Sequence, residues 1–313
     1  MTRRSQAAQE RLLAKIYQDV PAAELEAFRR FRAENPPKTA EIGGRTWTWL
    51  SGGTGDRDDR TLLFLPGAQG TGESVWGNIS HFSARFRWIA PSYPPVATME
   101  ELTDGIAALL DGEGIGQVVA IGGSYGGFVA QVFVRRHRDR VEKLILSHTA
   151  PPNPRRGEII AGSVRWLPWF PLFLLRMQYR KVMSGLVPKI PELALVHAYL
   201  EELIALHLTK DGIINGYRRV AGYDLEHRFT PADLEGWPGR VLLLLTDNDP
   251  STPEPVRNAM KALYPGAEVH LYSGSGHATG ILKREEYLGA IEGFLEPPPT
   301  SAAATPPPPP PPD

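Results

Sequence analysis

The stretch that most constrains this chain is Gly122-Gly-Ser-Tyr-Gly126, which has the pattern Gly-x-Ser-x-Gly. The apolar run 118–121 precedes it, and residues 127–133 follow with apolar side chains at helical spacing. This context predicts a strand, a sharp turn and a helix, with Ser124 at the tip. A Cβ at either flanking glycine would collide with the neighbouring strand or helix. The alternative is a glycine-rich turn with an ordinary serine, but the flanking elements favour a nucleophile elbow that exposes the serine hydroxyl.

Short apolar strands alternate with helices on both sides of this turn. Residues 61–65, 86–90 and 141–147 have strand character, and 61–65 is apolar throughout, as in a strand covered on both faces. The repeated order of strand and helix predicts an α/β fold with a mostly parallel, doubly wound sheet. No strand is evident over residues 151–236, and residues 240–246 then resume the sheet. We therefore expect a helical insertion between two strands of the sheet.

The pattern divides the chain into four predicted parts. They are an N-terminal helical extension (1–36), an α/β core (37–150 and 237–296), the helical insertion (151–236) and a proline-rich tail (297–313). We interpret the N-terminal helices as a cap packed on the core, with a dimerisation or docking arm as the alternative. The tail is predicted to be disordered, because a proline run lacks donors and favours an extended polyproline II chain.

To act as a nucleophile, a serine needs a base within hydrogen-bond distance and an acid that hydrogen-bonds to that base. After an elbow of this kind, the acid and then the histidine follow in chain order. The loop after residues 240–246 offers Asp247 and Asp249, of which we choose Asp249 because it lies deeper in the loop, before a proline. The glycine-rich loop after the last predicted strand holds His277, our candidate base. His148 could line a pocket, but it lies in the wrong loop for the base.

The negative charge that develops on an attacked carbonyl oxygen requires two backbone N–H donors. The elbow supplies the N–H of Tyr125. The loop after strand 61–65 should supply the second, and we predict Ala68 N–H, with Gln69 as the alternate. The reaction needs no metal or cofactor, so none is predicted.

These motifs resemble those of the α/β-hydrolase superfamily over residues 38–296, and most of all its maspardin-type branch. The resemblance rests on Leu65-Pro-Gly-Ala-Gln-Gly-Thr-Gly72, on the elbow with the helix after it, and on Met260-Lys-Ala-Leu-Tyr-Pro-Gly266. It implies that the insertion is a lid over the active site. Maspardin itself resembles a hydrolase without the catalytic histidine and is regarded mainly as a binding protein. The presence of His277 in this chain therefore favours catalysis.

The amino-acid composition excludes some classes of binding partner and indicates the cellular compartment. The net charge of −1 argues against a nucleic-acid binder, and the absence of cysteine excludes disulfides and thiolate sites. With no signal-peptide pattern and no apolar run long enough to span a bilayer, we expect a cytoplasmic protein. The apolar part of the insertion, residues 164–176, could be a helix packed on the core, a pocket wall or a weak membrane-surface patch. Basic residues flank it: Arg155, Arg156, Arg165, Arg176, Arg180 and Lys181.

Three functions are compatible with these residues, and the sequence indicates no oligomeric state. The leading hypothesis is a serine hydrolase that cleaves a small-molecule carboxylic ester through an acyl-enzyme on Ser124, with His277 and Asp249 completing the triad. The second is a proline-type aminopeptidase or amidase, which would need acidic residues of the insertion to hold a free amine. The third is a non-catalytic binding protein, which the maspardin resemblance allows. Candidate acids for the second are Glu192, Glu201 and Glu202.

Overall fold

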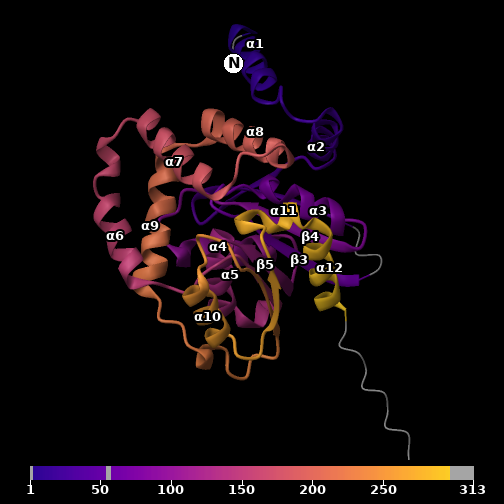
Figure 1. The fold of residues 1–313 in the computed structure, drawn as a ribbon, viewed down its shortest axis with the longest axis vertical. Coiled ribbons are helices and arrows are strands. Elements are labelled where there is room, and N and C mark those ends of the chain that lie inside the picture. Colours follow the sequence, from indigo (N-terminus) through magenta and orange to yellow (C-terminus); the bar gives the residue numbers. More distant parts are fainter. Residues whose placement is uncertain (1–2, 54–57, 297–313) are drawn as a thin grey trace, which may run out of the picture.

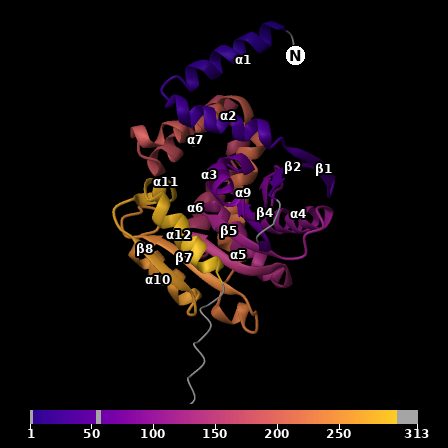
Figure 2. The same ribbon diagram turned by 90° about the vertical axis from the view of Figure 1, so that its right-hand side faces the viewer.

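The computed structural model describes residues 3–53 and 58–296, and the predicted disordered tail, residues 297–313, lies outside the described residues. One sheet runs through the centre of the molecule with helices on both faces (Figure 1). The helices that follow β6 form a separate layer at one end of it, and the N-terminal helices lie next to that layer (Figure 2).

The sheet has eight strands in the order β1-β2-β4-β3-β5-β6-β7-β8. The first two strands form an antiparallel hairpin, and β2 also pairs antiparallel with β4. All the other neighbouring strands are parallel, which confirms the predicted mostly parallel, doubly wound sheet. The strands are β1 (Lys38–Ile42), β2 (Arg45–Gly52), β3 (Asp58–Leu65), β4 (Phe86–Ser92), β5 (Val118–Gly123), β6 (Val141–Ser147), β7 (Arg240–Thr246) and β8 (Glu268–Tyr272).

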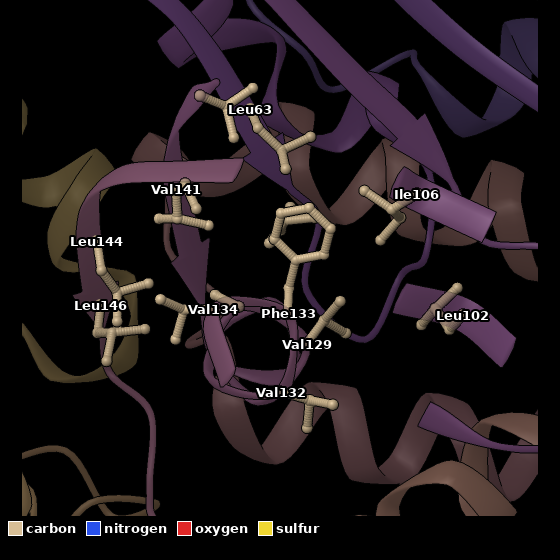
Figure 3. Close-up of a cluster of buried hydrophobic side chains, with 14 of the residues drawn as sticks. Leu63, Leu102, Ile106, Val129, Val132, Phe133, Val134, Val141, Leu144 and Leu146 are labelled. Atoms are coloured by element: carbon tan, nitrogen blue, oxygen red, sulfur yellow. The ribbon is translucent and has the colours of Figure 1, made fainter. Parts of the chain in front are cut away.

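Two apolar clusters explain why the central strands carry almost no polar side chains. Leu63 packs against helices on one face of the sheet, whereas its neighbours Leu62 and Phe64 pack on the opposite face. On the first face, side chains of α5 such as Phe133 lie between the sheet and α4 (Figure 3). Burial on both faces requires apolar residues at every position of such a strand. The helices around the sheet are α3 (Trp76–Phe82), α4 (Met99–Gly112), α5 (Tyr125–Arg136), α10 (Glu254–Leu263), α11 (Thr279–Leu282) and α12 (Arg284–Leu295).

Between β6 and β7 the described chain is helical, as predicted. Helical spacing in the sequence predicts one helix over 191–208, but this region is a 3₁₀ turn at Pro191–Leu193, an α-helix and a π-helical turn at Leu203–His207. A hydrogen bond from Leu208 N–H to the Leu203 carbonyl closes the π turn at 2.8 Å. The α-helices here are α6 (Pro154–Val164), α7 (Leu172–Leu186), α8 (Ala194–Glu202) and α9 (Lys210–Glu226). No helix within residues 3–53 and 58–296 combines the length and the apolarity needed to cross a bilayer.

The N-terminal region contains two helices, α1 (Arg3–Ile16) and α2 (Ala22–Glu34). Phe28 of α2 packs edge-on against Tyr199 of α8. Arg32 of the same helix makes ion pairs with Glu73, after β3, at 2.6 Å and with Glu202, at the end of α8, at 3.0 Å. The extension is therefore joined both to the core and to the helices after β6.

Candidate active site

Ser124 occupies the turn between β5 and α5 with φ 53° and ψ −122°, values that a residue other than glycine rarely adopts. The glycines on either side leave room for this turn. A Cβ on Gly122 would lie 2.3 Å from the Gly126 carbonyl oxygen, and a Cβ on Gly126 would lie 2.1 Å from the Leu65 carbonyl oxygen. The Ser124 N–H donates to the Ser147 carbonyl at 2.9 Å, which ties the turn to the end of β6. The predicted order of strand, sharp turn and helix is present.

His277 and Asp249 meet from the loops that follow β8 and β7. Nδ1 of His277 lies 2.7 Å from Oδ2 of Asp249, whose residue is only 2% exposed. The other carboxylate oxygen accepts from the N–H of Ser251 at 2.8 Å and from its hydroxyl at 2.7 Å. Burial by itself would raise the pKa of Asp249, but the His277 and Ser251 donors outweigh burial and hold that pKa well below its usual range. Since an ionised carboxylate only accepts hydrogen bonds, it holds the proton of His277 on Nδ1.

Of the two acids considered from sequence, Asp249 contacts His277 and Asp247 does not. The Asp247 carboxylate accepts from the Ser273 hydroxyl at 2.7 Å and from the Gly274 N–H at 3.0 Å. Its neighbour Asn248 accepts from the Gly276 N–H at 2.9 Å. These two side chains therefore hold the loop that carries His277.

His148, which the sequence predicted only as a possible pocket residue, packs against His277. The His148 backbone has φ 48°, and its ring packs edge-on against that of His277 with 5.7 Å between centroids. Nδ1 contacts the Ser147 hydroxyl, and Nε2 lies 2.8 Å from Oγ1 of Thr246. Burial, assisted by the nearby His277, lowers the pKa of His148 to about 4, so this ring is neutral at physiological pH. Its position directly after the strand that binds the elbow was the signal available in the sequence.

The elbow and the histidine lie at the same edge of the sheet, because Ser147 binds the Ser124 N–H and the adjacent His148 contacts His277. Among the described residues, neither the Ser124 hydroxyl nor Nε2 of His277 makes a hydrogen bond, so both groups are available for a substrate. No cluster of three or more potential metal ligands occurs in the described part of the chain.

A cavity of about 390 Å³ opens between this edge of the sheet and the helices after β6. Ala68, its alternate Gln69, and Tyr125 all line it, whereas Ser124, Asp249 and His277 are not among its lining residues. The backbone N–H groups of Ala68 and Tyr125 donate to no acceptor among the described residues. Most of the remaining wall is apolar and comes from α7, α9 and the π turn, and no aspartate or glutamate is among the described lining residues.

A nucleophile elbow on a doubly wound sheet, with a histidine and a buried aspartate in the later loops, is the architecture of the α/β hydrolases. The model of the alpha/beta hydrolase family matches residues 62–290, and the chain belongs to this family. The resemblance and the fold class expected from sequence are both confirmed.

Three known proteins illustrate the similarity. The chain is 26% identical over 189 residues to the proline iminopeptidase PfmaB of Pestalotiopsis fici, covering 58% of this chain and 67% of that one. It is 32% identical over 118 residues to human maspardin, covering 37% of this chain and 38% of maspardin. Among solved structures, the enol-lactonase of Burkholderia xenovorans is similar with a TM-score of 0.68 at 17% identity, covering 82% of this chain and 99% of that one. The last likeness concerns the fold alone.

Proposed function

We propose that this protein hydrolyses a carboxylic ester through an acyl-enzyme on Ser124. The Ser124 hydroxyl transfers its proton to Nε2 of His277 as its oxygen attacks the carbonyl carbon, and the N–H groups of Ala68 and Tyr125 bind the resulting oxyanion. When the ester C–O bond breaks, His277 returns the proton to the leaving alcohol. Water then attacks the acyl-enzyme with His277 as base, which releases the acid and regenerates the serine. Asp249 orients the imidazole and stabilises its cation.

The observation that carries this proposal is the 2.7 Å contact between His277 and a buried, ionised Asp249 beside a strained serine turn. Such a contact presents Nε2 of His277 as a base, which a turn without catalytic function would not require. Strained backbone at a serine that follows a buried strand also fits a functional role.

The test compares Ser124→Ala with Ser80→Ala, a control at an exposed position of α3. With short p-nitrophenyl esters, we expect Ser124→Ala to lose at least about 10³-fold in kcat and the control to keep wild-type activity. A fluorophosphonate probe should label the wild type at Ser124. Esterase activity that survives in Ser124→Ala would contradict the mechanism. A folded wild type that neither turns over esters nor reacts with the probe would instead support a binding protein.

The aminopeptidase alternative is less well supported by the cavity than the ester hypothesis. The three glutamates that could have held a free amine are not among the cavity-lining residues. Glu201 pairs with Arg180 at 2.7 Å, and Glu202 pairs with Arg32. The wall instead contains the cation of Arg219. We therefore expect proline β-naphthylamide to be hydrolysed much more slowly than simple esters, and the reverse order would favour the aminopeptidase.

We further propose that residues 151–236 act as a lid on the core, and that the outer side of this lid makes weak contact with membrane surfaces. Trp169 is 82% exposed and Phe173 is 68% exposed, which is unusual for such large apolar side chains. Residues 154–190 contain seven arginines and lysines against one glutamate. Exposed aromatic rings beside an excess of basic residues suit the interface of an anionic bilayer. We also propose that the protein is located in the cytoplasm.

A further inference from the structure

The cavity wall contains a buried arginine whose charge is not balanced. Arg219, on α9, is 5% exposed and lines the cavity together with Tyr125. Nε donates to the Tyr125 hydroxyl at 2.6 Å, and Nη1 donates to the carbonyl oxygens of Pro94, at 3.3 Å, and Val96. All three acceptors are neutral. Among the described residues Nη2 has no acceptor and no carboxylate lies within ion-pair distance of this guanidinium.

Two buried acids in the described part of the chain pair with arginines. Asp224, five residues further along α9, is fully buried and accepts two hydrogen bonds from Arg156, both at 2.6 Å. Glu202 pairs with Arg32. A guanidinium cannot lose its proton in a protein, and a buried charge without a counter-charge is strongly unfavourable. Arg219 therefore lacks the partner that the buried acids have.

The free edge of the guanidinium faces the cavity. Nη2 lies 4.0 Å from the position that a Cβ on Gly216 would occupy, and Gly216 is itself a lining residue. Tyr125 connects this cation to the proposed reaction centre, because its hydroxyl accepts from Arg219 while its backbone N–H belongs to the proposed oxyanion hole. A group bound at Nη2 would thus lie about one tyrosine side chain away from the reacting carbonyl.

We propose that the substrate is an ester that carries a carboxylate, and that Nη2 of Arg219 binds this carboxylate inside the cavity. This inference rests on the proposed function, since it specifies the substrate of the same site. The apolar wall and the single free edge of the guanidinium favour a monoanion such as a carboxylate, because a dianionic phosphate would need further donors. The α7 and α9 side chains then contact the hydrocarbon that links the carboxylate to the ester.

Matched esters test the proposal on the intact chain. In the first pair the acyl side differs: monoethyl glutarate ends in a carboxylate, and ethyl valerate ends in a methyl group. In the second pair the alcohol side differs in the same way: 3-acetoxypropanoate ends in a carboxylate, and propyl acetate ends in a methyl group. We expect the wild type to prefer the anionic member of at least one pair by about tenfold or more in kcat/KM. Arg219→Met should abolish that preference through a rise in KM of about 10–100-fold, the size expected for a charge-assisted hydrogen bond. Hydrolysis of the neutral esters should change by less than about threefold.

Two further variants separate binding from folding. Arg218→Met removes an exposed arginine next in sequence and should keep the preference. Arg219→Lys keeps the positive charge and should therefore keep part of the preference for the anionic ester. An equal loss for anionic and neutral esters in Arg219→Met would overturn the proposal, because it would mean that Arg219 only supports Tyr125 and the loop at Pro94. A wild type that hydrolyses these esters without preference in either pair would also overturn it.

A binding measurement distinguishes this inference from the proposed hydrolysis. In Ser124→Ala, which cannot turn over, monoethyl glutarate or 3-acetoxypropanoate should raise Tm, whereas ethyl valerate and propyl acetate should not. The additional Arg219→Met substitution should remove the effect. If esters are not hydrolysed but the anionic ligands still raise Tm through Arg219, the proposed reaction fails and the carboxylate site stands. If no anionic ligand raises Tm, the carboxylate site fails whatever the enzyme activity.

Discussion

At the residue scale, the backbone at Ser124 depends on the absence of side chains around it. A Cβ at Gly126 would stand 2.1 Å from a carbonyl oxygen of β3, so Gly126→Ala must displace either α5 or the strand. We expect the free energy of unfolding to fall by about 1–3 kcal/mol and the esterase activity by at least about tenfold, since the serine moves with the helix.

A matched glycine provides the control for this substitution. Gly289 lies in α12 with nothing within 4 Å of an added Cβ, so Gly289→Ala should be neutral or stabilise by about 0.5–1 kcal/mol. Urea unfolding and ester hydrolysis measured on both variants check the prediction. Equal effects of the two substitutions would show that the crowding at Gly126 is unimportant.

Protonation of a single side chain, His148, makes the stability of the folded protein depend on pH. Its pKa is about 4 in the folded protein and about 6.5 in an unfolded chain, so the unfolded state binds more protons between these values. Above pH 6.5 His148 makes its full contribution to the free energy of unfolding. This contribution falls by about 3 kcal/mol as the pH decreases toward 4. Urea unfolding at pH 7 and pH 4.5 should therefore show a smaller loss of stability in His148→Gln than in the wild type. The same loss in both proteins would contradict the assignment.

At the element scale, Arg32 joins α2 to the core and to the helices after β6. Burial would raise the pKa of Glu202, but donors from His207, Tyr17 and Arg32 outweigh it and lower this pKa to about 2. The stabilisation from Glu202 is therefore present above about pH 4.5 and is lost as the pH falls toward 2.

Arg32→Met should reduce the free energy of unfolding at pH 7 by about 1–3 kcal/mol, less than for a fully buried pair because the Arg32 side chain is 31% exposed. Arg29→Met, at an exposed position of the same helix, is the control and should change stability by less than about 0.5 kcal/mol. Urea unfolding at pH 7 measures both. A loss in Arg32→Met no larger than in the control would show that the ion pairs contribute nothing to the attachment of α2.

At the scale of the whole molecule, the exposed aromatic side chains gather on one outer part of the chain. Helix α6 lies on the outer side of the helical layer (Figure 1). Trp169 lies between α6 and α7, and Phe173 lies in the first turn of α7. We expect the protein to co-sediment with vesicles that contain anionic lipid more than with neutral ones, and added salt should weaken this binding. The double variant Trp169→Ala/Phe173→Ala should reduce the bound fraction several-fold.

Leu271→Ala is the control for the vesicle experiment, because Leu271 is an exposed apolar residue on β8, outside this surface. It should bind vesicles like the wild type. A wild type that stays in the supernatant with anionic vesicles would refute the membrane contact, as would unchanged binding of the double variant.

The sequence by itself determined the fold class, the sharp turn at Ser124 and the order of the loops that carry Asp249 and His277. These features follow from local rules: strand and helix periodicity, the steric need for glycine around a sharp turn, and the chain order that parallel strands impose. The α4 cap also follows from a local rule, because Thr98 and Glu101 have capping-box spacing and exchange hydrogen bonds at the start of that helix. Local rules failed to predict the π turn after α8, since no local pattern distinguishes it from a continuing helix.

Only the tertiary structure decided which groups surround each aspartate, where His148 lies and what surrounds Arg219. The sequence favoured Asp249 over Asp247 by its place in the loop. The partners of the two carboxylates, Ser273 for Asp247 and His277 for Asp249, come from a distant loop that the local pattern does not position. Arg219 meets Tyr125 across 94 positions of chain, a contact set by how α9 packs over the edge of the sheet. Charge balance inside a protein depends on such long-range contacts, which is why a buried arginine without a partner is invisible in the sequence and evident in the fold.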